Sequence, residues 1–422
     1  MKVAFETLGC KVNQCETERL IEIFKNKGYE VVSSDSFADV YIINTCTVTG
    51  MADRKSRQYI RRAKKINPLS IVAATGCYVQ MSRDEVAGIE GVDIVCGNKD
   101  KMNLPDYVEK KSAEAVRASG RASLAPVKTR GFIKIQDGCD RFCSFCVVPY
   151  ARSEMWSMPA DDILREGEKL IKNGYKEVVL TGINTALYKT EDGSGIEDII
   201  RELNNMPFDF RIRLSSLEPT VIDAQFVQRL FKYEKLCRHL HLSLQSGSDK
   251  VLGLMNRKYS LEDYMEIVRV LKGFDECYGI STDLIAGFPG EEEADFAASL
   301  DVISAALFCK VHVFKYSCRK GTAAVNMSGH VGGSEKVRRS KMLISEGESS
   351  AENFFTRNMD TTRRVLIEEY DEKNRAWVGY TDNYIKVYID ISGGQYINSF
   401  VDVRLKELYK EGMRGELDET CT

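Results

Sequence analysis

The chain has 422 residues, and its 59 Lys and Arg against 62 Asp and Glu give a net charge of -3 at pH 7. This length allows two or three domains with sizeable cores, and the charge excludes a general attraction to nucleic acid, so any RNA binding must use local patches. No apolar run approaches the length of a membrane span, and the first eight residues lack the layout of a secretory signal, so we expect a cytoplasmic protein without membrane contact.

The first hundred residues alternate apolar strands with amphipathic helices. The pattern predicts helices over 16–27 and 52–66, and strands over 3–8, 40–43, 71–74 and 92–95. Such alternation favours a Rossmann or flavodoxin-like parallel sheet with helices against it.

Three cysteines stand where predicted strands end. Cys10 follows its strand after Gly9, Cys46 follows after Asn44-Thr45, and Cys77 follows after Thr75-Gly76. Because ligands collect beyond the carboxyl ends of strands in open α/β sheets, we expect these thiols to converge and bind a metal cluster. The alternative is three unrelated small apolar residues in turns.

The predicted helix 52–66 carries most of the local positive charge. Its basic residues are Arg54, Lys55, Arg57, Arg61, Arg62, Lys64 and Lys65. A basic helix can contact a phosphate backbone, and we take Arg57, Arg61 and Arg62 as candidate RNA contacts. An ordinary solvated helix face is the alternative.

A second series of β/α units follows a polar linker. Residues 110–130 lack apolar periodicity, and strands are then predicted over 132–135, 177–180, 211–214, 239–244, 281–285 and 310–314. Helices are predicted over 160–172, 221–233, 261–274 and 291–306. Repeated units of this kind favour a complete or partial TIM-like (β/α) barrel, whose working residues lie at the carboxyl ends of the strands.

The first strand of this series leads into Cys139-Asp140-Arg141-Phe142-Cys143-Ser144-Phe145-Cys146. Three thiols at C-x3-C-x2-C spacing can hold three corners of a metal centre and leave the fourth open for substrate. A zinc site completed by a distant ligand, or three buried thiols, are the alternatives. Zinc sites usually carry a second C-x2-C pair, which this sequence lacks, so an iron-sulfur cluster is favoured.

The motif, with Phe145 just before the third cysteine, resembles that of the radical S-adenosylmethionine enzymes. The stretches 8–14, 44–48 and 75–78 resemble the amino-terminal domain of one subgroup, the methylthiotransferases. The Gly-Cys-Lys-Val-Asn start is most similar to the branch that acts on N6-threonylcarbamoyladenosine in tRNA. The resemblance implies two 4Fe-4S clusters: a radical-generating cluster on Cys139, Cys143 and Cys146, and an auxiliary cluster on Cys10, Cys46 and Cys77.

The family resemblance also implies a rim of S-adenosylmethionine contacts at the carboxyl ends of the barrel strands. The candidate contacts are Phe145, Gly182, Ser216, Glu218, Gln245 and Arg257. The Arg257 guanidinium suits the methionyl carboxylate, although a surface arginine is an equal alternative. The sequence departs from the family pattern at Trp156-Ser157-Met158, at Asn184 and around Cys318.

The last sixty residues are predicted to form short strands. A helix over 334–359 precedes strands over 365–369, 376–380, 385–389 and 400–405, with a turn at 393–394. The segment resembles the RNA-binding TRAM module, a small all-β barrel in which Tyr380 and Tyr384 could stack on unpaired bases. A barrel that only stabilises its neighbour is the alternative.

The predicted organisation is an amino-terminal domain over 1–115, a linker over 116–130, a radical barrel over 131–360 and a TRAM-like domain over 361–422. The resemblance implies methylthiolation of C2 of N6-threonylcarbamoyladenosine next to the anticodon, with one S-adenosylmethionine as methyl donor and a second as radical source. The expected partners are tRNA and an electron donor such as a flavodoxin or ferredoxin. The rivals are a sibling acting on isopentenyladenosine or a ribosomal-protein aspartate, and a non-catalytic, metal-stabilised RNA-binding protein.

Overall fold

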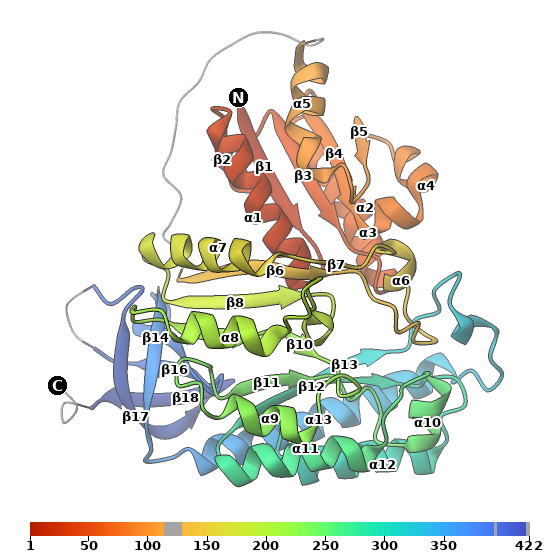
Figure 1. Ribbon diagram of the computed structural model, residues 1–422. Coiled ribbons are helices and arrows are strands. Elements are labelled where there is room, and N and C mark those ends of the chain that lie inside the picture. The colour runs from red at the N-terminus through yellow and green to blue at the C-terminus, as the bar shows by residue number, and fades with distance from the viewer. Residues whose placement is uncertain (114–128, 392–394, 419–422) are drawn as a thin grey trace. The chain divides into compact units, whose positions relative to one another are not determined.

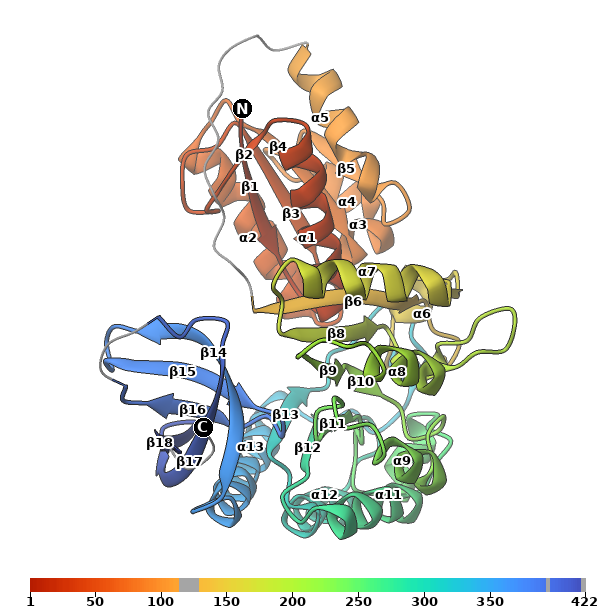
Figure 2. The same cartoon turned by 60° about the vertical axis from the view of Figure 1, so that its left-hand side comes forward.

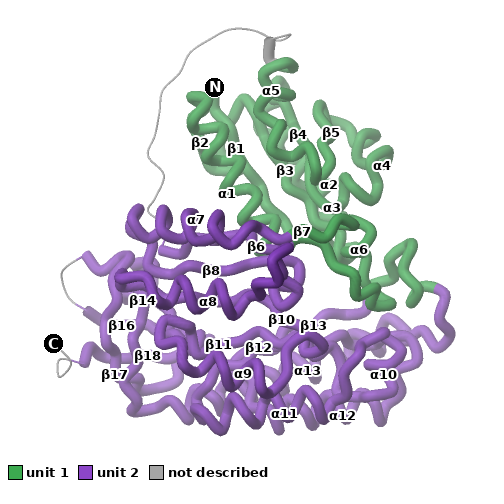
Figure 3. Tube along the Cα trace, in the orientation of Figure 1, with its two compact units in different colours: residues 1–126, 137–156, 317–325 green, residues 127–136, 157–316, 326–422 purple. Residues whose placement is uncertain are grey.

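The computed structural model describes residues 1–113, 129–391 and 395–418 (Figure 1). The chain divides into two compact units, coloured separately in Figure 3. Unit 1 comprises residues 1–126, 137–156 and 317–325, and unit 2 comprises residues 127–136, 157–316 and 326–422. The predicted linker 116–130 lies almost entirely outside the described residues.

Unit 1 is built on a parallel five-stranded sheet of order β2-β1-β3-β4-β5. Its strands are β1 (Lys2–Thr7), β2 (Glu30–Val32), β3 (Val40–Thr45), β4 (Ile71–Gly76) and β5 (Ile94–Cys96). Alternate strand residues face opposite ways, so the sheet has two apolar faces. This is the doubly wound, flavodoxin-like arrangement that the alternation predicts.

Helices cover both faces of the unit 1 sheet. Leu20 and Phe24 of α1 (Lys11–Asn26) and Leu104 of α5 (Leu104–Ala113) pack on one face. Ile60 and Ala63 of α2 (Gly50–Ile66) pack on the other, together with α3 (Cys77–Met81) and α4 (Arg83–Ala87). The register of side chains along β3 and β4 thus fixes which helix covers which face.

Two distant segments of the chain complete unit 1. The segment 137–156 contains the three-cysteine motif and α6 (Val148–Ala151), and the segment 317–325 includes most of η3 (Ala323–Asn326). The two segments are joined by a 2.8 Å hydrogen bond from the Ala324 amide to the Ser144 carbonyl. Unit 1 therefore contains all six cysteines that the sequence singles out.

Unit 2 contains two four-stranded sheets, β7-β6-β8-β9 and β10-β11-β12-β13. Their strands are β6 (Arg130–Asp137), β7 (Trp156–Ser157), β8 (Glu177–Gly182), β9 (Arg211–Leu214), β10 (Ser216–Leu217), β11 (His239–Leu242), β12 (Gly279–Ala286) and β13 (Lys310–Lys315). Only Ser215 separates β9 from β10, and β6, β8 and β9 pair in parallel, as do β10 to β13. The strands thus form the partial (β/α) barrel that was predicted.

Helices line the outside of these strands and bury one continuous apolar core with them. They are α7 (Ala160–Lys172), α8 (Ile196–Asn204), α9 (Ala224–Leu230), α10 (Asp249–Leu254), α11 (Leu261–Phe274) and α12 (Glu293–Ala306), with a short η2 (Thr185–Leu187). No helix among the described residues is both long and apolar enough to span a membrane.

The long helix α13 (Gly333–Arg357) leads from the partial barrel to a closed β-barrel of order β14-β15-β16-β18-β17 (Figure 2). Its strands are β14 (Thr362–Asp371), β15 (Ala376–Thr381), β16 (Lys386–Ile389), β17 (Phe400–Tyr409) and β18 (Gly412–Leu417). Val365, Val387 and Leu405 lie in its core. The small all-β barrel is as predicted, and the turn predicted at 393–394 lies outside the described residues.

Candidate functional site

The topological switch point of the unit 1 sheet lies between β1 and β3, because the chain moves from β1 to β2 on one side and continues with β3 on the other. Cys10 is the N-cap of α1 after β1, and Cys46 directly follows β3. Cys77 is the first residue of α3, after the neighbouring β4. The carboxyl ends of three adjacent strands thus deliver the three thiols to the place where such sheets bind ligands.

Two glycines allow the chain to close around Cys46. A side chain on Gly9, which has φ +97°, would place its Cβ 2.6 Å from the Cys46 sulfur. A side chain on Gly76, with φ +100°, would place its Cβ 2.3 Å from the Thr45 carbonyl oxygen. Only glycine tolerates both the positive φ and the lack of room for a Cβ at these positions. The two glycines therefore let the backbone pass close to Cys46 and Thr45.

The thiols of Cys10, Cys46 and Cys77 also interact electrostatically. Burial, with smaller contributions from the neighbouring Cys77 and Cys10, raises the pKa of Cys46 to about 12. The surface of Cys10 is open to solvent, yet crowding by protein raises the pKa of its thiol, and Cys77 again adds to the effect. A cationic metal centre would reverse this cost by favouring the thiolates.

Among the described residues, no three Cys, His, Asp or Glu side chains are spaced to hold a single metal ion. A four-iron cluster is larger than one ion, and its thiolates stand around its corners. Three thiols gathered behind glycine turns, with one of them open to solvent, fit such a cluster better than a closed zinc site.

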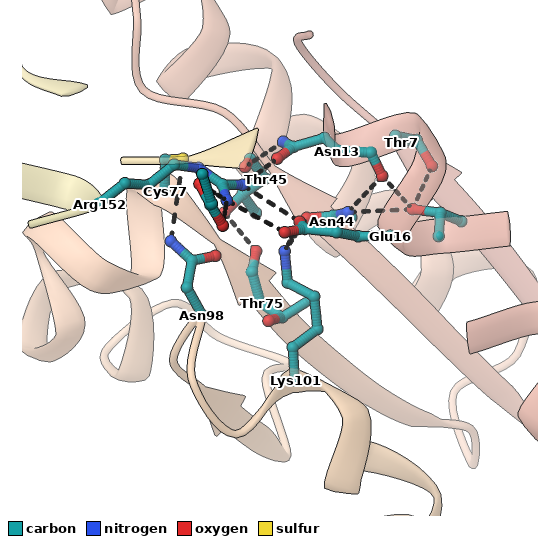
Figure 4. A network of polar contacts seen from close by, with 12 residues as sticks. Thr7, Asn13, Glu16, Asn44, Thr45, Thr75, Cys77, Asn98, Lys101 and Arg152 are labelled. Atoms are coloured by element: carbon teal, nitrogen blue, oxygen red, sulfur yellow. Dashed lines mark hydrogen bonds and ion pairs between the residues drawn. The ribbon is translucent and has the colours of Figure 1, made fainter. Parts of the chain in front are cut away.

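A buried polar network lies next to Cys77 (Figure 4). The Glu16 carboxylate accepts from Lys101 Nζ at 2.5 Å and from Arg152 Nη1 and Nη2 at 3.0 and 3.1 Å. Arg152 also bonds Asp137 at 2.8 Å, and its Nη2 donates to Asn13 Oδ1 at 3.0 Å. The network ties α1 to the segment that carries the C-x3-C-x2-C motif.

The motif itself forms a short loop whose thiols are partly buried. The Cys146 amide donates to the Cys143 carbonyl at 2.9 Å, and the Val148 amide donates to the Cys146 sulfur at 3.4 Å. Gly138 has φ +79°, and a Cβ there would lie 2.3 Å from the Glu154 carbonyl oxygen. Backbone contacts therefore set the loop, and an amide dipole already points at one of its sulfurs.

Most candidate cofactor contacts lie in unit 2. Glu218 and Arg257 form a buried ion pair at 3.1 Å, and Asn184 Nδ2 donates to Glu218 at 2.7 Å. Arg257 also donates to the Ser243 carbonyl at 2.9 Å. A substrate carboxylate at Arg257 would therefore compete with Glu218, so this contact stays a prediction.

The remaining rim candidates stand at strand ends. Gly182 ends β8, and a Cβ there would meet Gln136 at 3.0 Å. The Ser216 carbonyl in β10 accepts from Thr185 Oγ1 at 2.7 Å. Gln245 follows β11 with φ +75°, an uncommon conformation for a side-chain-bearing residue. Phe145 lies in the unit 1 loop instead.

Most of the candidate RNA contacts already have partners within their own units. Arg57 Nη1 donates to Tyr78 Oη at 2.6 Å, Arg62 pairs with Asp35 at 2.6 Å, and Arg61 is exposed. Tyr384 stacks on His239 with ring centroids 4.5 Å apart, and the Arg130 guanidinium lies 4.7 Å from the Tyr380 ring. Base stacking by these tyrosines would displace existing partners, and RNA contact by either set remains a prediction.

Sequence reasoning missed Arg152, Asp137 and Asn98. Asn98 Nδ2 donates to the Cys77 sulfur at 3.9 Å and to the Ala151 carbonyl at 3.3 Å. The only local signal was a charged Arg152 that closes the apolar run 147–151 just after the cysteine motif. Its partners are remote in sequence.

Comparisons with known proteins define the class first. Three family models match successive parts of the chain: "Uncharacterized protein family UPF0004" over residues 2–97, "Radical SAM superfamily" over 133–303 and "TRAM domain" over 360–417. Unit 1's sheet, the partial barrel and the closed β-barrel thus belong to a radical S-adenosylmethionine protein with a TRAM domain.

Relatives with assigned functions identify the group of radical S-adenosylmethionine proteins to which the chain is most similar. "Threonylcarbamoyladenosine tRNA methylthiotransferase MtaB" of Bacillus subtilis is 38% identical over 91% of this chain and 89% of its own, and the Thermotoga maritima protein of the same name is 36% identical over 97% and 96%. A "tRNA-2-methylthio-N(6)-dimethylallyladenosine synthase" of Thermodesulfovibrio yellowstonii is 30% identical over 99% of both chains. The chain belongs to the radical S-adenosylmethionine methylthiotransferase family.

Solved structures agree on the fold. The radical S-adenosylmethionine methyltransferase TsrM from Kitasatospora setae superposes with a TM-score of 0.56 at 14% identity, covering 77% of each chain. OxsB, a cobalamin-dependent S-adenosylmethionine radical enzyme, gives 0.51 at 12% identity, covering 83% of this chain and 56% of its own. At these identities the likeness concerns fold alone.

Proposed function

We propose that the protein replaces the C2–H of N6-threonylcarbamoyladenosine, next to the anticodon of tRNA, with a methylthio group. The observation that carries the proposal is the presence of two cysteine sets in one compact unit, one set on a loop and the other at a sheet switch point. Relatives named for this nucleoside are 33–38% identical, against 30–31% for those named for dimethylallyladenosine.

Cys139, Cys143 and Cys146 would hold the radical-generating 4Fe-4S cluster, and Cys10, Cys46 and Cys77 the auxiliary one. When bound, the first cluster supplies the electron that cleaves S-adenosylmethionine, and a second S-adenosylmethionine supplies the methyl group. Radical chemistry suits this substrate because an aromatic C2–H is neither acidic nor electrophilic enough for side-chain acid-base catalysis.

The described residues position the cysteine loop and the candidate cofactor contacts. Arg152 and Asp137 hold the cysteine loop against α1, and the Val148 amide orients the Cys146 sulfur. In unit 2, Glu218 and Arg257 would exchange their buried ion pair for contacts with the amino and carboxylate groups of a methionyl moiety. These groups are preorganised by Asn184 and Ser243.

The partners follow from the reaction. The protein acts on tRNA in the cytoplasm, and a one-electron donor such as a flavodoxin or ferredoxin reduces the radical-generating cluster. The TRAM domain is the module through which tRNA would be held.

The test is mass spectrometry of tRNA nucleosides from cells that lack the gene and from the same cells complemented with variants. We expect 2-methylthio-N6-threonylcarbamoyladenosine to vanish without the gene and to return with the native chain. It should stay absent with Cys139→Ala and with Cys77→Ala. Cys318→Ala, an exposed cysteine outside both sets, is the matched control and should restore the product.

Two other outcomes would overturn parts of the proposal. Loss of a different methylthiolated nucleoside would assign the chain to the dimethylallyladenosine branch. Unchanged tRNA nucleosides would point to a protein substrate or to no catalysis. Anaerobic reconstitution separates these last two, because a non-catalytic RNA-binding protein would not cleave S-adenosylmethionine under strong reductant.

A further inference from the structure

Within the part of the chain that the structure describes, the Arg152 guanidinium forms hydrogen bonds through its two Nη atoms but not through its Nε atom. Its Nη1 and Nη2 donate to Glu16, Asp137 and Asn13, and its side chain is 3% exposed. Its Nε is also buried but has no hydrogen-bond partner among the described residues. A buried donor without an acceptor costs about 1–3 kcal/mol, so this N–H calls for an acceptor that the protein itself does not provide.

The Arg152 side chain lies beside Cys77 (Figure 4). Burial works to lower the pKa of Arg152, but Glu16 and then the neighbouring Cys77 raise it. Asn98 Nδ2 already donates to the Cys77 sulfur while holding the Ala151 carbonyl, next to Arg152 in the chain. The environment of this sulfur is therefore one of N–H donors, which suits an electron-rich acceptor.

We propose that the Nε–H of Arg152 donates a hydrogen bond to a sulfur of the auxiliary cluster on the Cys77 side, and that Arg152 thereby positions this cluster and raises its reduction potential. The inference rests on the proposed function, which assigns that cluster to Cys10, Cys46 and Cys77. A cation and a hydrogen bond near the sulfurs both stabilise the reduced, more negative cluster. Arg152 is a positioning residue in this role.

The measurement is the reduction potential of the auxiliary cluster, followed by electron paramagnetic resonance in a titration of the full chain. Cys139, Cys143 and Cys146 are replaced by Ala so that only the auxiliary cluster contributes. We expect Arg152→Gln to shift the equilibrium at least tenfold toward the oxidised form, which is 59 mV for a one-electron couple. Lys101→Met is the matched control.

Lys101 belongs to the same buried network but reaches only Glu16 and Asn44 in its hydrogen bonds. Its substitution should destabilise the apoprotein by a similar amount and shift the potential by less than half as much. Equal shifts in the two variants would overturn the assignment, because they would report the network's structural integrity alone. An unchanged potential in Arg152→Gln would overturn it as well.

Arg152→Lys separates charge from hydrogen bond, since it keeps the cation and removes the Nε–H. Its potential should fall between those of the native and Gln proteins, and the 15N hyperfine coupling of labelled arginine should disappear. A native potential in Arg152→Lys would overturn the hydrogen bond. If Arg152→Gln takes up no iron, Arg152→Lys alone tests whether Arg152 donates the hydrogen bond to the cluster.

The two proposals fail differently. If the Cys139, Cys143 and Cys146 variant with native Arg152 binds no cluster, the two-cluster function fails and this inference fails with it. If the cluster forms and its potential does not depend on Arg152, only the inference fails.

Discussion

Each compact unit contains a buried ionic network centred on one carboxylate. In unit 1, Glu16 lies between Lys101 and Arg152. In unit 2, Glu177 lies between Arg211 at 2.5 Å and Arg213 at 2.8 Å. Both carboxylates are almost inaccessible to solvent, so neither network gains from a surface location.

The two networks differ in the acceptors that their arginine N–H groups find. Arg211 Nη1 and Nη2 both donate to the Tyr380 carbonyl, and Arg213 donates to the carbonyls of Asp382 and Thr381. Neither arginine has a buried donor without a partner in the described part of the chain. The donors of Arg211 and Arg213 are therefore fully used and join the partial barrel to the closed β-barrel, whereas Arg152 in unit 1 leaves one donor beside a thiol. Full pairing of Arg211 and Arg213 indicates a structural role, and the unpartnered Arg152 Nε beside a thiol indicates a ligand.

The largest effect is expected from Glu177→Gln. It leaves two buried guanidinium groups without a counter-charge, which should lower the free energy of unfolding by about 3–5 kcal/mol. Chemical denaturation measures this loss. Glu197→Gln is the control, because Glu197 pairs with Arg229 and Lys232 on the surface and should cost about 0–1 kcal/mol. Equal losses in the two variants would show that the unit 2 network contributes no special stability.

Glu16→Gln should cost less, about 2–3 kcal/mol, because Asp137 still pairs with Arg152 and Asn44 still accepts from Lys101. It should also raise the reduction potential of the auxiliary cluster, the opposite direction to Arg152→Gln, since it removes a negative charge that offsets the arginine. Glu177→Gln should leave that potential unchanged. A shift of the same sign in Glu16→Gln and Arg152→Gln would contradict the difference between the two networks.

The local sequence pattern predicts many of the helices and strands, but it predicts little of the two buried ionic networks. The predicted bounds of β9, α7 and α11 are those observed, because their apolar periodicity is strong. Helix α9 starts later than predicted because Asp223 caps the Phe226 amide, and β2 and β18 were not predicted. β2 has only three half-buried residues, and β18 contains two glycines that weaken its strand pattern.

In the candidate site too, some residues could be predicted from the sequence and others could not. The cysteines could be placed from sequence because strand ends and motif spacing are local features. Arg152 could not, because its bond to Glu16 spans 136 residues. The assignment of 137–156 and 317–325 to unit 1 likewise depends on long-range contacts that no periodicity encodes.

The unit 2 network should also respond to acid. Burial works to raise the pKa of Glu177, but Arg213, Arg211 and Arg130 hold it well below its usual range. A carboxyl whose folded pKa lies below its unfolded value contributes stability that is complete above about pH 4.3 and is lost as pH falls through the folded pKa. Unfolding free energies from pH 7 to pH 2 should therefore fall more steeply in the native protein than in Glu177→Gln. Parallel curves would contradict this linkage.

The smallest effect is expected at Lys272, a half-buried cation outside both ionic networks. Lys272 of α11 donates to the Tyr278 carbonyl at 2.8 Å and lies 4.8 Å from the Phe354 ring centroid, with no carboxylate within ion-pair distance among the described residues. Burial lowers the pKa of Lys272 to about 8. Because the folded pKa is below the unfolded value, the charged lysine destabilises the fold at neutral pH, and stability is recovered as pH rises from about 8 to about 10.4.

Lys272→Met should therefore raise the free energy of unfolding at pH 7 by about 1 kcal/mol, after the loss of one hydrogen bond and one cation–π contact is offset. The gain should shrink between pH 8 and pH 10, where the native amine loses its charge. Lys258→Met, at an exposed position, is the control and should show no such pH dependence. If Lys272→Met destabilised the protein at pH 7, the fold would accommodate a half-buried cation without a carboxylate partner as well as it accommodates the paired arginines. Full pairing would then lose its value as a criterion for a structural role.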